Sequence, residues 1–149
     1  KVNTLIDAYC GSGLFSVFLS PYAEKVIGIE INEKSVRYAQ INAENAGIKN
    51  AAFIHGDMEE ILQRGFLPMG DRANLIVLDP PRTGCDKTVL NAITALQPEK
   101  IIYISCNPAT QARDVSFLSE SGYDLRSLTP VDMFPQTEHI EVVGFLEKK

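Results

Sequence analysis

With 149 residues, 45% of them hydrophobic and 22% charged, the chain fits one globular domain with a substantial core. Its formal net charge of −5 argues against a domain that holds nucleic acid unaided, because such domains are usually basic. Three widely spaced cysteines argue against a disulfide framework and against structural zinc. No apolar run is long enough to span a membrane. We therefore expect a reduced, cytoplasmic protein without metal.

Apolar, strand-like segments alternate with helix-like segments through most of the chain. In the first half we expect, in chain order, a strand at 4–9, a helix at 14–19, a strand at 25–30, a helix at 33–46, a strand at 51–55 and a helix from about 58 to 64. Asn32 fits an N-cap for the helix at 33–46, and Gly47 fits its C-terminal stop.

The second half continues the alternation and then departs from it. We expect a strand at 73–78, a helix at 87–96, a strand at 100–105, a helix at 110–119, and two final strands at 123–130 and 140–146. Five strand–helix alternations predict an α/β fold whose sheet is mostly parallel, with helices on both faces. The last two strands have no helical pattern between them and predict a hairpin-like, antiparallel closing edge, giving one domain over 1–149 with seven strands.

A glycine turn and two acids mark the ends of the first three strands. Gly11 and Gly13 follow the first strand, but Ser16 stands where a dinucleotide fingerprint needs a third glycine. Glu30 ends the second strand, at about the distance where an acid accepts hydrogen bonds from ribose, and Asp57 follows the third. Together they favour an adenosine without a pyrophosphate, hence S-adenosylmethionine rather than NAD. The alternative is that both acids are helix caps or solvated loop residues.

A second group of residues follows the fourth and fifth strands. Asp79-Pro80-Pro81-Arg82 is a stiff loop that could hold a planar base. Cys106 stands where the fifth strand stops and a helix begins, a place that favours a thiolate. The ends of strands one, four and five lie together in doubly wound sheets, so Asp79 and Cys106 are expected to share a cleft with the glycine turn. Cys10 and Cys85 are expected to be core residues.

Glu141 starts the last strand, and strand alternation predicts that His139 shares its face. A thiol and a carboxylate beside a sulfonium donor suggest one reaction. A thiolate that adds to C6 of uracil makes C5 nucleophilic toward a methyl group, and a carboxylate then removes the C5 proton so that the thiolate can leave. His139 is expected to orient Glu141 rather than to act as the base.

Five stretches, in order along essentially the whole chain, resemble the RNA 5-methyluridine methyltransferases, which act on uridines in tRNA or ribosomal RNA. They are DAYCGSG (7–13), GIEIN (28–32), LDPPRTG (78–84), SCNPATQARD (105–114) and FPQTEHIE (134–141). The resemblance implies a Rossmann-like methyltransferase fold that uses S-adenosylmethionine. It implies that Cys106 is the nucleophile and Glu141 the proton-abstracting base. It also implies a cofactor site lined by Tyr9, Gly11, Gly13, Glu30, Asp57 and Asp79.

The chain also departs from the family's full pattern. Leu14 stands where many members carry Asn, and the N-terminal RNA-binding segments and an upstream Gln cofactor ligand of full-length members are absent. The resemblance therefore implies the catalytic domain of a longer protein, whose RNA is held mainly by segments outside this chain. We expect that domain to be a monomer.

Three other functions stay open. Exocyclic-amine methyltransferases share an Asp/Asn-Pro-Pro loop but place an aromatic residue where this chain has Arg82. Cytosine-5 methyltransferases usually carry their cysteine in the proline loop, which here has none. A non-catalytic module that binds cofactor or RNA is the third. Arg82 and Arg113 fit either RNA phosphate contacts, stabilisation of the thiolate, or surface ion pairs.

Overall fold

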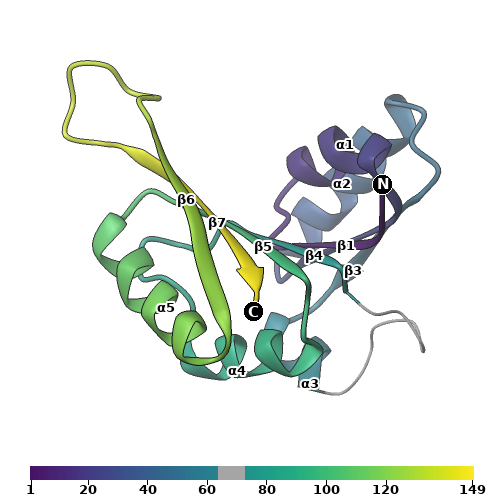
Figure 1. Cartoon of the computed structure of the whole chain (residues 1–149). Coiled ribbons are helices and arrows are strands. Elements are labelled where there is room, and N and C mark those ends of the chain that lie inside the picture. The colour runs from purple at the N-terminus through teal and green to yellow at the C-terminus, as the bar shows by residue number, and fades with distance from the viewer. Residues whose placement is uncertain (64–72) are drawn as a thin grey trace.

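The computed structural model describes residues 1–63 and 73–149, and these residues build a single mixed sheet (Figure 1). Its described strands are β1 (Val2–Ala8), β2 (Ala23–Glu30), β3 (Ala51–His55), β4 (Leu75–Leu78), β5 (Lys100–Ser105), β6 (Tyr123–Val131) and β7 (Glu141–Lys148). The strand order is β3-β2-β1-β4-β5-β7-β6. Strands β1 to β5 are parallel, whereas β7 runs antiparallel to both β5 and β6. The predicted parallel sheet with an antiparallel closing edge is confirmed.

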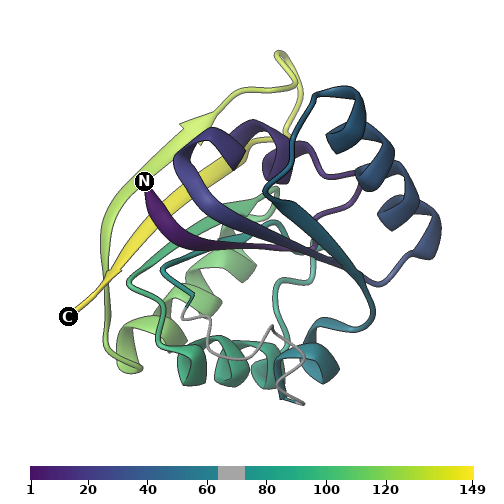
Figure 2. The same cartoon turned by 90° about the vertical axis from the view of Figure 1, so that its right-hand side faces the viewer.

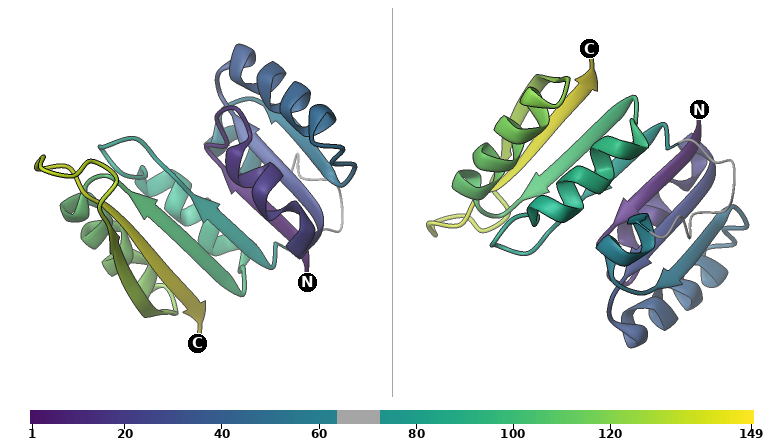
Figure 3. Two further views of the ribbon diagram at one scale, coloured as in Figure 1. Left: turned by 90° about the horizontal axis from the view of Figure 1, so that it is seen from above. Right: turned by 90° about the horizontal axis from the view of Figure 1, so that it is seen from below.

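Helices cover both faces of the sheet (Figures 1 and 3). They are α1 (Leu14–Leu19), α2 (Glu33–Asn45), α3 (Met58–Gln63), α4 (Lys87–Leu96) and α5 (Pro108–Glu120), with a short 3-10 turn, η1 (Ser20–Tyr22), after α1. Helices α1 and α2 lie on one face over β1 to β3, and α3, α4 and α5 lie on the other. None of the described helices is both long and apolar enough to cross a membrane.

The main core lies between the sheet and helices α3 to α5, and a smaller core lies beneath α1. In β5 the burial alternates residue by residue: Ile101 and Tyr103 are buried in the main core, whereas Ile102 and Ile104 pack partly buried against the smaller one. This period-two pattern places every second residue of β5 against α4 and α5. The main core therefore holds the fifth strand, and the residue that follows it, in a fixed orientation.

Several predicted elements match the structure residue for residue, namely the strands at 51–55 and 100–105 and the helices at 14–19 and 87–96. The predicted start of the helix at 110–119 is wrong, because α5 already begins at Pro108. Asn107 caps it by accepting a hydrogen bond from the Ala109 N–H (3.2 Å), and proline suits the first helical position. The predicted helix from about 58 to 64 is present as α3 up to Gln63, and Arg64 lies outside the described residues.

The ends of the other strands differ by at most two residues from prediction. The first strand begins at Val2 and ends at Ala8, so that Tyr9 stands in the turn. The second begins at Ala23, and the fourth begins at Leu75 instead of 73. The parallel arrangement gathers the carboxyl ends of β1 to β5 at one edge of the sheet. Both chain termini lie at the opposite edge (Figure 2).

Candidate functional site

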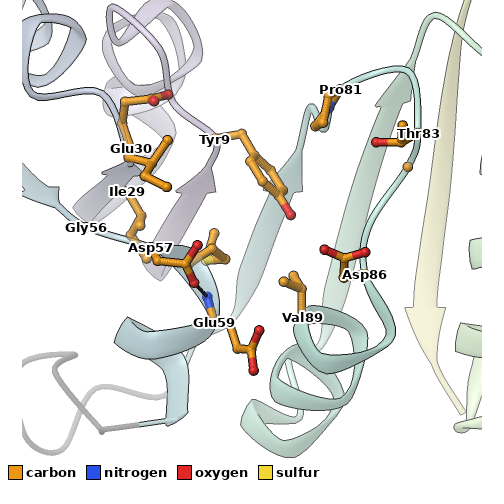
Figure 4. Close-up of a pocket in the computed structure, with 13 residues that line it drawn as sticks. Tyr9, Ile29, Glu30, Gly56, Asp57, Glu59, Pro81, Thr83, Asp86 and Val89 are labelled. Carbon is orange, nitrogen blue, oxygen red and sulfur yellow. Dashed lines mark hydrogen bonds between the residues drawn. The ribbon is translucent and has the colours of Figure 1, made fainter.

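A cavity of about 170 Å³ opens at the carboxyl ends of β1, β2 and β3 and beside the loop after β4 (Figure 4). Its lining includes three of the predicted cofactor residues, Tyr9, Glu30 and Asp57. The remaining lining residues are Ile29, Ile31, Gly56, Met58, Glu59, Pro81, Thr83, Gly84, Asp86 and Val89. Acidic groups and apolar side chains thus face one another across a single hollow, as Figure 4 shows.

Tyr9 enters this cavity because its backbone turns sharply at the end of β1. Its φ of 64° lies in the left-handed region, which bulky residues rarely adopt. The turn is held by the Cys10 N–H, which donates to the Ile29 carbonyl (2.9 Å). The ring points between the strand ends, and burial, together with the nearby Cys85 thiol, raises the pKa of the Tyr9 hydroxyl. Tyr9 is therefore neutral and presents a flat, half-buried face to the hollow.

The carboxylate of Glu30 is fixed by two backbone groups. Its Oε2 accepts a hydrogen bond from the Gly11 N–H (3.0 Å), and its Oε1 accepts one from the Asn32 N–H (2.8 Å). Glu30 therefore ties the glycine turn to the start of α2 while facing the cavity. Gly13 allows the same turn, because its φ is +83° and a Cβ there would lie 3.0 Å from the Cβ of Ala39.

Asp57 is both a helix cap and a residue that lines the cavity. Its Oδ1 accepts hydrogen bonds from the Glu59 N–H (2.8 Å) and the Glu60 N–H (3.2 Å), so it caps α3. The residue nevertheless lines the cavity, opposite Asp86 in Figure 4. One carboxylate oxygen is thus used by the helix, and the residue still faces the site.

Asp7 is a residue that the sequence motif contained but that sequence reasoning gave no role. It is fully buried, its Oδ2 accepts a hydrogen bond from the Ser16 hydroxyl (2.6 Å), and its Oδ1 has no partner in the described structure. Burial raises the pKa of Asp7 to about 6, and the charges of Asp79 and Glu30 add to the shift. An unpartnered acceptor next to other acids is suited to a cationic group. The only sequence signal was its place four residues before Gly11, the first glycine of the turn.

Cys106 and Glu141 adjoin the last registered pair of the antiparallel strands β5 and β7. That pair is Ser105 with Val142, so Cys106 directly follows one member and Glu141 directly precedes the other. Cys106 stands in the bend after β5, and Glu141 is the first residue of β7. Asp79 belongs to the same group, because burial and the Glu141 carboxylate raise its pKa. These residues are not among those that line the cavity.

The three cysteines differ in their surroundings. Cys106 is partly exposed, whereas Cys10 and Cys85 are buried. Burial raises the pKa of the Cys10 thiol to about 12 and that of the Cys85 thiol to about 11, so both are protonated at neutral pH. The prediction that Cys10 and Cys85 are core residues is confirmed.

Two further predictions concern the side chains of His139 and Arg113. His139 lies two residues before the first residue of β7, so strand alternation does not relate it to Glu141, and the shared face stays a prediction. Its ring instead lies edge-on to Phe134, with centroids 6.2 Å apart. Arg113 forms an ion pair with Asp114 (2.8 Å), which supports the ion-pair interpretation. No group of three or more metal-binding side chains is present in the described parts of the chain.

Comparisons with known proteins agree over the whole chain. The sequence model of the family described as tRNA (uracil-5-)-methyltransferase matches residues 1–149. An uncharacterized RNA methyltransferase of Halalkalibacterium halodurans is 46% identical over 147 residues, which cover 99% of this chain and 32% of the relative. One of Listeria innocua is 45% identical over 147 residues, with the same two coverages. The chain thus spans about a third of the length of these relatives.

A solved structure confirms the fold. The crystal structure of Pyrococcus abyssi tRNA (uracil-54, C5)-methyltransferase in complex with S-adenosyl-L-homocysteine superimposes with a TM-score of 0.84. The two sequences are 30% identical, and the match covers 98% of this chain and 34% of that one. The Rossmann-like methyltransferase fold predicted from the sequence is therefore confirmed.

Proposed function

Because the chain belongs to the tRNA (uracil-5-)-methyltransferase family, we propose that it is the catalytic domain of an RNA methyltransferase that transfers a methyl group from S-adenosylmethionine to C5 of a uridine. The observation that supports this proposal is the register of β5 with β7, whose last registered pair, Ser105 with Val142, adjoins Cys106 and Glu141. A nucleophile and a base in that relation, at the same sheet edge as an acid-lined cavity, suit addition to C6 followed by removal of the C5 proton.

The cavity supports the cofactor part of the proposal. Glu30 is held by backbone N–H groups in an orientation suited to accept hydrogen bonds from ribose hydroxyls, and Asp57 and the Tyr9 ring face the same hollow. When bound, S-adenosylmethionine would supply an electrophilic methyl group. At about 170 Å³ the cavity is smaller than the roughly 300 Å³ typical of ligand pockets. The ligand would therefore extend from it along the turn at Gly11 and Gly13, toward Asp79.

We propose a balanced sequence of bond changes at the uridine. The Cys106 thiolate forms a bond to C6, which places the electron pair on C5 and O4. C5 would then form its bond to the methyl carbon as the bond from that carbon to the sulfonium sulfur breaks, with the electron pair of the broken bond staying on the sulfur of the departing S-adenosylhomocysteine. Glu141 removes the C5 proton, the C5–C6 double bond re-forms, and the bond from sulfur to C6 breaks. Cysteine suits both the addition and the departure, because a thiolate is a good nucleophile and a good leaving group.

RNA is the proposed partner, from either tRNA or ribosomal RNA. The chain carries 14 basic and 19 acidic residues, and RNA-binding surfaces are basic. Relatives are about three times as long as this chain. We therefore propose that most of the phosphate contacts come from parts of the protein outside these 149 residues.

The roles of Cys106 and Glu141 are tested by covalent trapping in the full-length protein. With uridine-containing RNA and S-adenosylmethionine, Glu141→Gln should accumulate a protein–RNA adduct, because the C5 proton stays in place and the thiolate cannot leave. Cys106→Ala should form no adduct and no 5-methyluridine. Gel shift under denaturing conditions and mass mapping of methylated nucleosides measure both results.

The matched control is Glu138→Gln, an exposed carboxylate three residues before Glu141, which should turn over without accumulating an adduct. Peptide mapping should place the RNA on the peptide that contains Cys106 and not on those with Cys10 or Cys85. Methylation by the Cys106→Ala protein would contradict the mechanism and would favour direct transfer, as in an exocyclic-amine methyltransferase.

A further inference from the structure

The loop from Asp79 to Asp86, between β4 and α4, is bound to helix α5 at several points. The carbonyl of Arg82 accepts hydrogen bonds from the Asn107 side-chain amide (3.1 Å) and from the Thr110 hydroxyl (3.2 Å). These bonds join the part of the loop that follows the two prolines to the first turn of α5. The residue that precedes this turn and its cap is Cys106.

The loop's second half is held by an adjacent pair of charged residues in α5. Arg113 donates from Nη2 to the carbonyls of Thr83 (3.0 Å) and Cys85 (3.2 Å). Asp114 accepts from the Cys85 backbone N–H at its Oδ2 (2.8 Å). The loop backbone is thus bound through both its donors and its acceptors.

Asp114 is the centre of this arrangement. It is only 1% exposed, and its Oδ2 also accepts from the Tyr103 hydroxyl (2.6 Å), while its Oδ1 pairs with Arg113 (2.8 Å). A buried carboxylate is stable only when it is paired with a cation and hydrogen-bonded. Asp114 meets both conditions, because Arg113 pairs with it and because the Cys85 N–H and the Tyr103 hydroxyl donate hydrogen bonds to it. Asp114 therefore joins three parts of the molecule: the loop at Cys85, strand β5 at Tyr103, and helix α5.

The contacts around Asp114 connect the segment that carries Cys106 with the cavity that contains Tyr9. Tyr103, on β5, lies three residues before Cys106, and the hydroxyls of Tyr103 and Tyr9 both lower the pKa of the Cys85 thiol, against the larger effect of burial. Gly84 is required at the point of closest approach. Its φ is +77°, and a Cβ would come within 2.6 Å of both Arg113 Nη2 and Asp114 Oδ2.

We propose that Asp114, together with Arg113, is a positioning residue that holds the 79–85 loop in register with the Cys106 junction. The inference rests on the proposed function, because its consequence is the placement of the base-holding loop relative to the attacking sulfur. Asp114 touches neither cofactor nor base. It acts through the Cys85 N–H and Tyr103, and a shift of about 1 Å in such a placement costs about 100-fold in rate.

The test compares Asp114→Asn with the wild type in the full-length protein. The asparagine places an NH₂ group against either the guanidinium or the Cys85 N–H, so one side of the attachment is lost. Hydrogen exchange of the peptide that spans 80–86 should accelerate roughly tenfold or more, with the exchange of β1 and β4 unchanged. The kcat for methyl transfer should fall roughly 10- to 100-fold, and S-adenosylhomocysteine should still bind at one equivalent per chain.

The binding stoichiometry separates positioning from stability. A merely structural role would lower the number of binding-competent molecules and leave kcat per competent molecule unchanged, and this result would overturn the proposal. If Asp114→Asn does not fold, Arg113→Gln decides. The Arg113 side chain is 57% exposed, and its loss should lower kcat in the same direction by a smaller factor. Arg126→Gln, in an exposed ion pair on β6, is the matched control and should keep the wild-type kcat.

The outcomes also distinguish the two proposals. If the wild-type protein methylates no uridine, the proposed function fails. Hydrogen exchange of the peptide that spans 80–86 still tests whether Asp114 and Arg113 hold the loop against α5. Unchanged loop exchange in both variants overturns the inference whatever the activity. Accelerated exchange with unchanged kcat also overturns it, because the attachment would then not position the reacting groups.

Discussion

Asp7 lowers the stability of the folded protein when it is ionised, because its carboxylate is buried near other acids. Its pKa is raised by burial from 3.8 to about 6, while one of its oxygens has no partner among the described residues. The folded state therefore binds the Asp7 proton more tightly than the unfolded state. The free energy of unfolding must fall as pH rises from about 4 to about 6, by roughly 3 kcal/mol in all, and the cost is fully present above pH 6.

Asp7→Asn should remove this pH dependence. Relative to the wild type, the variant should gain roughly 1.5 kcal/mol in free energy of unfolding between pH 5 and pH 7.5, because only the wild type ionises there. Urea unfolding at the two pH values measures the difference. Asp132→Asn, at an exposed position, controls for the substitution itself. An equal effect of Asp7→Asn at both pH values would show that Asp7 does not carry the raised pKa.

Glu30 and Asp7 show what can be predicted at the level of single residues. Glu30 has a sequence signal, since it ends a strand at a recognisable distance from the glycine turn, and it does line the cavity. Asp7 has no comparable signal. Its role depends on the packing of Ser16 from α1 and on the charge of Asp79 from the loop after β4. Contacts between distant segments of this kind are not visible in local pattern.

Helix α2 owes part of its stability to its cap. The Asn32 side chain accepts a hydrogen bond from the Ser35 N–H (3.1 Å), as the sequence predicted. Asn32→Ala should lower the free energy of unfolding by about 1 kcal/mol, since one N–H of the first turn loses its partner. Denaturant titration measures the loss.

The N-cap of helix α4 can be compared with that of α2. Its N-cap residue, Asp86, makes no side-chain hydrogen bond to the helix. Asp86→Ala should therefore cost less than Asn32→Ala. An equal or larger loss at Asp86 would mean that capping hydrogen bonds do not determine the difference between the two helices.

The elements differ in how far local sequence defines them. Strand β5 is apolar, β-branched and bounded by polar residues, so its limits are found from sequence alone. Helix α5 begins two residues earlier than predicted because Pro108 can open a helix as well as follow one. Cys106 and Glu141 are 35 positions apart in the sequence, and the register of β5 with β7 puts both beside the last registered pair, Ser105 with Val142. Sequence patterns identified both residues but did not fix this register.

On the scale of the whole molecule, ligand binding should stabilise the fold by mass action. At 100 times its Kd, S-adenosylhomocysteine should raise the free energy of unfolding by about 2.7 kcal/mol. Glu30→Gln should remove most of this increase, because its NH₂ group would meet either the Gly11 N–H or the Asn32 N–H. Thermal unfolding with and without ligand measures the effect.

Glu24→Gln is the matched control, since Glu24 is an exposed residue near the other end of the same strand, β2. It should keep the full ligand-dependent increase in Tm. If Glu30→Gln also kept the full increase, the ligand would not depend on the carboxyl end of β2, and the cavity at Tyr9 and Asp57 would then not be its site.

Both chain termini lie at the sheet edge opposite the cavity (Figure 2). Strand β1 has seven residues, so about 23 Å of extended backbone separates Lys1 from the glycine turn. A fluorophore or surface anchor attached at Lys149, where β7 ends, would likewise stand a full strand length from Cys106. Such an attachment leaves the end of the sheet that carries Cys106 open, and it allows binding of the proposed RNA substrate to be tested by energy transfer without a probe in the site.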